Sequence, residues 1–344
     1  MFTVYAEKEI FENIVVFNNE TPNWYSIFCN HSEILLNISK EDLEKEEVPG
    51  TPIFEFINSN AGKRPINLDG FFKEIKENKS LIIEKPRSAF LLNISKEEAD
   101  ELQAKYGVIV QSHSALDDGI LKGTFYKNLQ ENEIIDLNGK NGWLSLLNIP
   151  LPPMNSLIVS DPYLFANEDG KRGVANLMQF LEAILPNKLE ADFHVLLLTP
   201  EHKDKDLRWC EQIIQEIRTV LDAFKNPYPI VFELVFAETF HKRIAISNYF
   251  SLTMDKGFGV FKTKDLKTVQ EDNEMLIHRI FHRVLLSEGQ TEFKRADLNL
   301  KSINKVYKTV KEYISNRPND KNHRIMGDCN KDKSLKNRLI NDLD

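Results

Sequence analysis

The second half of the chain alternates short runs that are apolar at nearly every position with longer amphipathic segments, and this alternation limits the folds open to it. The apolar runs are SLIVSDPYLF (156–165), FHVLLLT (193–199) and IVFELVF (230–236). Strands of this kind belong to sheets that are covered by helices on both faces. The amphipathic stretches 173–185 and 207–224 lie between them and predict helices. The pattern therefore predicts βαβ units and a mixed or parallel sheet.

Later segments extend this part of the chain. Strands are predicted over 243–254 and 257–262, and helices over 271–286 and 303–314. Beyond Ser315 polar and charged residues dominate, which predicts a loose tail over 316–344.

The first 115 residues show the same alternation. Predicted strands occupy 2–6, 33–38, 80–83, 89–94 and 106–112, and predicted helices start at Glu7, Ser39 and Ser95. Residues 116–154 are richer in Gly, Asn and Pro, and prolines such as Pro150 and Pro152 cannot join a helix or a central strand. We therefore expect an α/β protein of two domains, 1–115 and 155–315, each a mixed β-sheet flanked by helices, with 116–154 as a connector.

The sequence LLNISKE occurs twice, over 35–41 and 91–97. In each copy a strand leads to a serine that is followed three residues later by an acidic residue, Asp42 or Glu98, which is typical of a helix N-cap. The repetition fits either a duplicated unit or capping chemistry that is used twice. Because the surrounding residues do not match, it does not predict a repeat architecture.

The composition narrows the class of protein. The formal net charge of −8 argues against a broad positive surface for nucleic acid, although a local basic groove remains compatible with it. The three cysteines are far apart and predict reduced thiols. No run approaches the roughly 20 apolar residues of a membrane span, and the N-terminal residues do not resemble a secretory signal. We therefore expect a cytoplasmic protein that does not enter a membrane.

The strongest chemical signal is the segment FAETFHKRIAISNYF, residues 236–250. It places His241, Arg243 and Asn248 at the spacing His-x-Arg-x4-Asn. This segment resembles the phospholipase D superfamily, whose motif is His-x-Lys-x4-Asp, with arginine at the lysine position and asparagine at the aspartate position. The resemblance extends over residues 155–265 and implies that the second domain is phospholipase D-like.

The resemblance implies a mechanism without a metal or another cofactor. His241 would attack phosphorus and form a phosphohistidine, and a second histidine would protonate the leaving oxygen. Arg243 keeps the positive charge and adds a planar fork for phosphate oxygens. Asn248 would position the site, although it cannot stabilise an imidazolium as aspartate does, so Asp161 or Glu238 is an accessory candidate for the missing carboxylate.

Only one copy of the motif is present, so the second histidine would have to come from a homodimer or from a partner protein. The resemblance implies binding or cleavage of a phosphodiester, in nucleic acid or a nucleotide, as a nuclease in nucleic-acid processing or prokaryotic antiviral defence. The alternative is a non-enzymatic interaction or scaffold subunit with a degenerate site. In that case His241 is an ordinary strand-edge histidine, and its basic neighbours are solvated.

Two other groups are weaker candidates. His278 and His282 would share one face of the predicted helix, but no third ligand is evident, so we expect a partly buried pair without a metal. The first strand would end at Glu7, with Glu9 nearby, a placement similar to nuclease-like folds whose first strand ends at an acidic metal ligand. The usual aspartate is absent there, and the competing interpretation is a non-catalytic scaffold.

Overall fold

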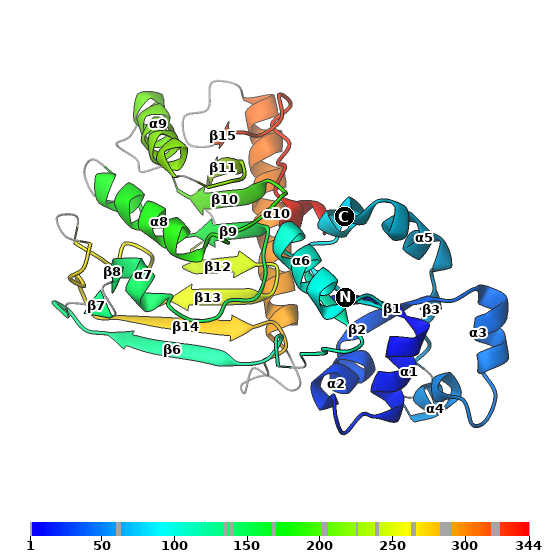
Figure 1. Cartoon of the computed structure of the whole chain (residues 1–344). Coiled ribbons are helices and arrows are strands. Elements are labelled where there is room, and N and C mark those ends of the chain that lie inside the picture. The colour runs from blue at the N-terminus through cyan, green and yellow to red at the C-terminus, as the bar shows by residue number, and fades with distance from the viewer. Residues whose placement is uncertain are drawn as a thin grey trace.

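The chain forms two large sheets that lie next to each other, with helices packed on both (Figure 1). The computed structural model describes residues 2–59, 63–117, 119–133, 136–137, 140–166, 170–200, 206–224, 226–237, 241–262, 266–282, 291–317 and 324–343.

The N-terminal sheet is parallel at every described pairing, in the order β3-β2-β1-β4-β5. Its strands are β1 (Phe2–Glu7), β2 (Ser32–Asn37), β3 (Ile66–Asn67), β4 (Ser88–Leu92) and β5 (Ile109–Ser112). Its helices are α1 (Lys8–Val16), α2 (Pro22–Asn30), α3 (Lys40–Glu46), α4 (Pro52–Ser59), α5 (Asp69–Glu77), the 3-10 helix η1 (Lys79–Glu84) and α6 (Lys96–Tyr106). Because the strand order reverses between β1 and β4, the sheet is doubly wound.

The two copies of LLNISKE become equivalent elements on either side of β1: β2 with α3, and β4 with α6. The Ser39 hydroxyl accepts a hydrogen bond from the Asp42 N–H at 3.1 Å, and the Ser95 hydroxyl accepts one from the Glu98 N–H at 3.1 Å. Both predicted N-caps are therefore confirmed.

The C-terminal sheet has the order β15-β11-β10-β9-β12-β13-β14-β6. Its strands are β6 (Thr124–Leu129), β9 (Ser156–Ser160), β10 (Phe193–Thr199), β11 (Ile230–Phe236), β12 (Ile244–Ser247), β13 (Phe250–Met254), β14 (Asn273–Arg279) and β15 (Arg324–Gly327). Its helices are α7 (Gly142–Leu146), α8 (Lys171–Ile184), α9 (Leu207–Ala223), α10 (Glu292–Asn316) and α11 (Arg338–Asn341), and β7 (Asp136–Leu137) pairs with β8 (Lys140–Asn141). Strands β9, β10 and β11 are parallel, with α8 and α9 on one face and α10 on the other (Figure 1).

The predicted helix over 271–286 is wrong, because its first half is strand β14. Met275 and Ile277 are buried, whereas Glu274 is exposed and Leu276 is half-buried, so the residues alternate across the sheet. A short apolar run is compatible with the period of a helix and with that of a strand. Here the pairing with β13 and β6 makes the segment a strand.

The predicted strand over 257–262 is also wrong: this segment forms only an isolated bridge, between Phe261 and Val269, and much of its backbone is bonded to side chains. The Phe258 N–H donates to Asp161, and the Phe261 N–H and carbonyl both bond to the side chain of Asn176. The predicted strand over 80–83 is a 3-10 helix, because the Asn78 side chain accepts from the Ser80 N–H and starts a turn.

Two segments that were predicted to be irregular belong to the C-terminal sheet. The expected connector over 116–154 contains α7 and strand β6, which pairs with β14. The expected tail over 316–344 contains β15 and α11, and Leu339 and Ile340 are buried against the sheet. A few buried positions among many charged ones do not show as a hydrophobic period, so the sequence pattern missed them.

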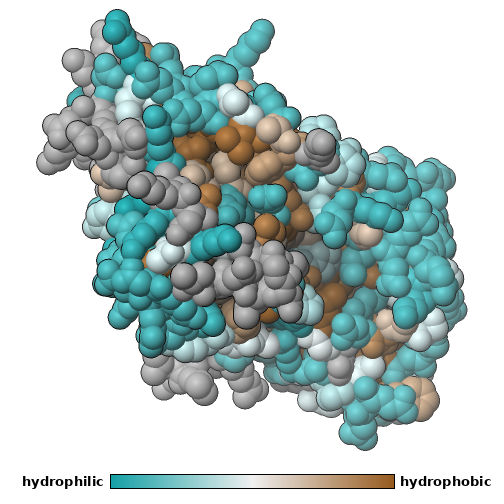
Figure 2. Space-filling model, turned by 60° about the vertical axis from the view of Figure 1, so that its left-hand side comes forward, coloured by the Kyte–Doolittle hydropathy of each residue, from teal (hydrophilic) through white to brown (hydrophobic). Residues whose placement is uncertain are grey.

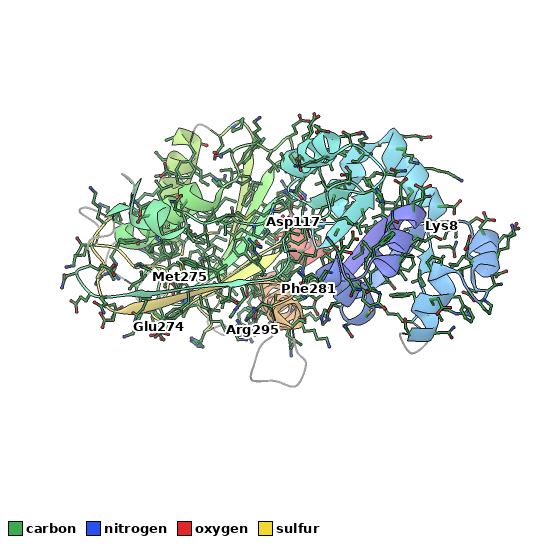
Figure 3. The ribbon with its side chains drawn as sticks, turned by 60° about the horizontal axis from the view of Figure 1, so that its bottom comes forward. Lys8, Asp117, Glu274, Met275, Phe281 and Arg295 are labelled. Atoms are coloured by element: carbon green, nitrogen blue, oxygen red, sulfur yellow. The ribbon has the colours of Figure 1, made fainter. Side chains whose placement is uncertain are left out.

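The two sheets share a continuous core at their junction, where Phe281 follows β14 and faces the N-terminal strands (Figure 3). The ring of Phe2 meets the rings of Phe281 and Phe293 edge-on, with centroids 4.9 and 5.7 Å apart. The Tyr249 hydroxyl donates to the Ser88 carbonyl at 2.5 Å and accepts from the Ile109 N–H at 3.0 Å. The contacts between the two sheets therefore stabilise the folded state of both.

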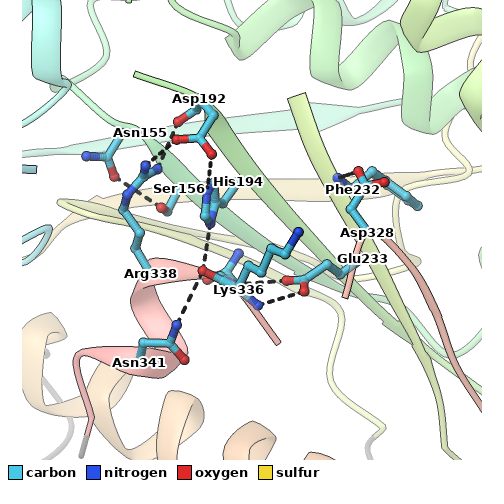
Figure 4. Close-up of polar contacts among 11 residues, drawn as sticks. Asn155, Ser156, Asp192, His194, Phe232, Glu233, Asp328, Lys336, Arg338 and Asn341 are labelled. Carbon is cyan, nitrogen blue, oxygen red and sulfur yellow. Dashed lines mark hydrogen bonds and ion pairs between the residues drawn. The ribbon is translucent and has the colours of Figure 1, made fainter. Parts of the chain in front are cut away.

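The residues around α11 close over the C-terminal sheet as a strap, which we define as Leu335–Asn341 (Figure 4). The fully buried carboxylate of Glu233 on β11 accepts hydrogen bonds from the backbone N–H groups of Lys336 at 2.7 Å and Asn337 at 3.0 Å. His194 on β10 contacts the Lys336 carbonyl at 2.8 Å. The strap is thus held by side chains of two neighbouring strands, β10 and β11.

This arrangement predicts a pH dependence of stability. Burial raises the pKa of Glu233 to about 7, against the hydrogen bonds from Lys336 and Asn337, which lower it. The folded state therefore holds a proton that the unfolded state releases near pH 4.5, and stability falls as the pH rises from 4.5 to 7. Relative to Glu233→Gln, the wild type should lose up to about 3 kcal/mol across this window.

Urea unfolding of both proteins at pH 5 and pH 7.5 measures this difference. Glu211→Gln, at an exposed position of α9, is the matched control and should leave the pH profile of the wild type unchanged. An equal pH profile for wild type and Glu233→Gln would show that Glu233 does not carry the effect.

Candidate functional site

The His-x-Arg segment lies where the parallel strands of the C-terminal sheet end. Strand β12 runs antiparallel to β9 with Ile244 opposite Ser160, so the residues before β12 lie beside those after β9. This register makes Arg243 a neighbour of Asp161. In open α/β sheets, ligands bind outside the carboxyl ends of the parallel strands. We name this place the carboxyl edge, meaning His241 to Arg243 and Asp161 to Tyr163.

Asp161 organises the backbone of the carboxyl edge. Its side chain is 1% exposed and accepts hydrogen bonds from the N–H groups of Tyr163 at 2.8 Å and Phe258 at 2.7 Å. Burial raises the pKa of Asp161, against these hydrogen bonds and the charge of Arg243. Gly257, at φ +93°, passes so close that a Cβ atom there would lie 2.5 Å from the carboxylate. The Asp161 carboxylate, which was the accessory candidate, therefore holds the two loops that contain Tyr163 and Phe258 in place.

Arg243 is held in one orientation. Its Nη1 donates to the Asp255 carbonyl, and its guanidinium carbon lies 5.0 Å from the centre of the Tyr163 ring. Met254 extends the strand pairing to this residue by donating its N–H to the Arg243 carbonyl at 3.1 Å. The positive charge at the lysine position of the motif is thus fixed before any ligand arrives.

His241 and Lys242 are exposed to solvent at the same edge. The Lys242 ammonium donates to the Asn299 side chain on α10 at 2.5 Å. His194 begins β10, and His278 ends β14, so both lie at the opposite edge of the sheet. The topology therefore brings neither of these histidines to His241.

Asn248 lies at the far end of β12 from His241, and the structure does not bring the two together. It is fully buried, and its side-chain oxygen Oδ1 accepts from the N–H groups of Asn155 at 3.2 Å and Ser156 at 3.1 Å. Its amide group donates to the Pro86 carbonyl at 2.7 Å. Asn248 thus joins the two sheets and does not touch the carboxyl edge. Glu238, the other accessory candidate, lies outside the described residues.

His278 and His282 do form a pair, although not on a helix. Their rings stack with centroids 4.8 Å apart, and His278 Nδ1 lies 3.0 Å from the Thr124 hydroxyl. Burial first, and then the charges of His282 and Arg295, lower the pKa of His278 to about 4. Within the described ranges, no group of three or more histidine, cysteine or acidic residues is placed to hold a metal.

The carboxyl ends of the N-terminal strands carry a second polar cluster. Glu7 accepts hydrogen bonds from the Asn93 N–H and, at 3.4 Å, from the Asn37 side chain, while Lys76 pairs with it at 3.3 Å. Glu9 accepts from the Asn93 side chain at 2.8 Å. Asn37 and Asn93 are the equivalent asparagines of the two LLNISKE copies. The repeated sequence therefore supplies partners for the acidic residues that were considered as metal ligands.

Tyr163 is the member of the carboxyl edge that sequence reasoning missed. Tyr163 is 54% exposed, and its ring lies against Arg243. An arginine on the neighbouring strand is not visible as a partner in a linear pattern.

The C-terminal part of the chain combines a helix-covered sheet of mixed direction with a His-x-Arg segment at the ends of its parallel strands. Residues 145–279 match the family model for the phospholipase D-like domain at the C-terminus of MIT. The C-terminal part of the chain thus contains a phospholipase D-like domain, as predicted. No curated protein matches the chain. Among the helices that the structure describes, none has the length and apolar character needed to cross a bilayer.

Proposed function

We propose that the chain binds a phosphodiester at the carboxyl edge. The observation that carries this proposal is the exposure of His241 and Lys242 next to a guanidinium, Arg243, that is already held by Asp255 and Tyr163. A fixed cation loses little side-chain entropy when a phosphate binds, and a charged hydrogen bond to phosphate is stronger than a neutral one. The match to a phospholipase D-like domain supports a phosphodiester as the ligand.

We propose further that His241 acts as a nucleophile when a second histidine is present. A ring nitrogen of His241 forms a bond to phosphorus, and the bond from phosphorus to the leaving oxygen breaks with its electron pair. The second histidine protonates that oxygen, and water then cleaves the phosphohistidine and restores His241. Two copies of the chain that face each other at the carboxyl edge would supply both histidines. A nucleic-acid substrate and an antiviral role remain predictions from the resemblance.

The test is binding and cleavage of bis(p-nitrophenyl) phosphate, RNA, and single- and double-stranded DNA in EDTA. We expect wild-type activity to survive EDTA and to fall by at least about a thousandfold in His241→Ala, because the nucleophile is lost. His113→Ala removes another exposed histidine, in the N-terminal half, and should behave as wild type. Sedimentation of the active protein should show a dimer.

The second candidate function is an interaction subunit without catalysis. It is favoured by Asn248, since the aspartate position of the motif is fully buried and makes contacts between the sheets. If folded wild type neither cleaves these substrates nor binds them through His241, the interaction subunit becomes the better interpretation.

A further inference from the structure

We propose that the ligand of the carboxyl edge is single-stranded nucleic acid, with one unpaired base stacked on Tyr163 while its phosphate lies against His241. This inference rests on the proposed phosphodiester site and adds the substrate class and the residue that selects it. Aromatic side chains beside positive charge form the usual platform for unpaired bases, because every base has a face that can stack.

The Tyr163 ring is exposed and yet held in place. It is 54% exposed, and the Arg243 guanidinium covers one face at 5.0 Å from the ring centre. The Tyr163 N–H donates to the buried Asp161 carboxylate at 2.8 Å, which fixes its backbone. A solvent-facing aromatic ring with a cation beneath it is already ordered for stacking, so little entropy is lost when a base binds.

Groups that could contact a base and a phosphate lie close to each other at the carboxyl edge. The segments that carry Tyr163 and His241 extend from β9 and β12, which are paired strands and so lie about 5 Å apart where they pair. Phe165, in the same loop as Tyr163, packs against Trp209 with ring centroids 6.2 Å apart. This contact brings the loop to the first turn of α9, where Leu207 is 44% exposed. Apolar and charged contacts therefore occur together at this edge.

The surface at this edge suits a single-stranded nucleic acid, whose bases are accessible, better than a duplex. The side of the molecule that lies at the left of Figure 1, where β9 and β10 end, has a hollow with apolar side chains among hydrophilic ones (Figure 2). A duplex would present its phosphates to the protein and hide the faces of its bases. With a net charge of −8, the chain is poorly suited to hold a duplex by its backbone alone.

The test compares three fluorescent probes on the full chain: a 12-nucleotide oligo(dT), an abasic strand of the same length, and a duplex of the same length. We expect oligo(dT) to bind about tenfold more tightly than the abasic strand, because one stacked base contributes roughly this factor. Tyr163→Ala should remove this preference. Tyr163→Phe keeps the ring and should keep the preference. His241→Ala should weaken binding of both single strands.

Each outcome has one meaning. Equal affinity for oligo(dT) and the abasic strand, with both lost in His241→Ala, overturns the stacking role and leaves the phosphodiester site standing. If neither strand binds, the stacking role and the nucleic-acid form of the site are overturned together. Tighter binding to the duplex than to oligo(dT) overturns the single-strand assignment. An oligo(dT) preference that survives in Tyr163→Ala shows that another residue reads the base.

Discussion

Asn248→Asp restores the aspartate of the phospholipase D motif, and we expect it to lower the free energy of unfolding by about 3 kcal/mol and to leave activity no higher. The reason is the position of Asn248 between the sheets. Its amide group donates to the Pro86 carbonyl at 2.7 Å and to the Asn155 side-chain oxygen at 3.1 Å. An ionised carboxylate has no N–H for these two acceptors and would be fully buried against them.

The loss of stability in Asn248→Asp should increase with pH. A protonated carboxyl group donates one hydrogen bond and carries no charge, so Asn248→Asp should be less destabilised at pH 5 than at pH 8. Chemical denaturation of wild type and variant at the two pH values gives both quantities. Asn19→Asp, at an exposed position after α1, is the matched control and should change stability by less than about 0.5 kcal/mol. A variant as stable as wild type, or one with higher cleavage activity, would refute the structural role of Asn248.

Asp297→Ala should also destabilise the chain by about 3 kcal/mol, because it leaves a buried arginine without its charge partner. Arg87 is 6% exposed at the start of β4, and its Nη1 lies 3.2 Å from the Asp297 carboxylate on α10. Its guanidinium carbon stacks 4.2 Å from the centre of the Phe293 ring. The pair therefore joins the N-terminal sheet to the long helix of the C-terminal sheet.

A double substitution separates the pair from the packing around it. Arg87→Met with Asp297→Leu removes both charges and should cost clearly less than Asp297→Ala alone, because neither charge is left unpaired. Asp69→Ala breaks the exposed pair with Lys73 on α5 and should cost less than about 1 kcal/mol. Urea unfolding of the wild type, the two single variants and the double variant measures these differences in stability. If Asp297→Ala costs no more than Asp69→Ala, the buried pair is not the link between the two halves.

The longer parallel strands of both sheets could be predicted from the sequence, because runs of apolar residues leave few other structures open. Strand β10 is an example. Helix α9 could be predicted from its amphipathic pattern, and the N-caps Ser39 and Ser95 from the local sequence. Strand β14 could not be predicted, because its apolar positions fit a helix until its partners on both sides are known.

The candidate site was predictable only in part. The position of His241 and Arg243 before a sheet strand follows from the local sequence, and so does the placement of Asp161 after β9. The use of Asn248 could not be deduced, because its partners Pro86 and Asn155 come from distant segments. Hydrogen bonds between segments far apart in the sequence cannot be predicted from the spacing of residues.

The order of strands in the C-terminal sheet has a consequence for synthesis on the ribosome. Strand β6 emerges first, but its partner β14 is made after most of the remaining sheet. At translation rates of about 5–20 residues per second, β6 waits on the order of ten seconds for its partner. During this time it presents an unpaired edge that other chains can join. We therefore expect the nascent chain to depend on chaperones more strongly than the finished protein does.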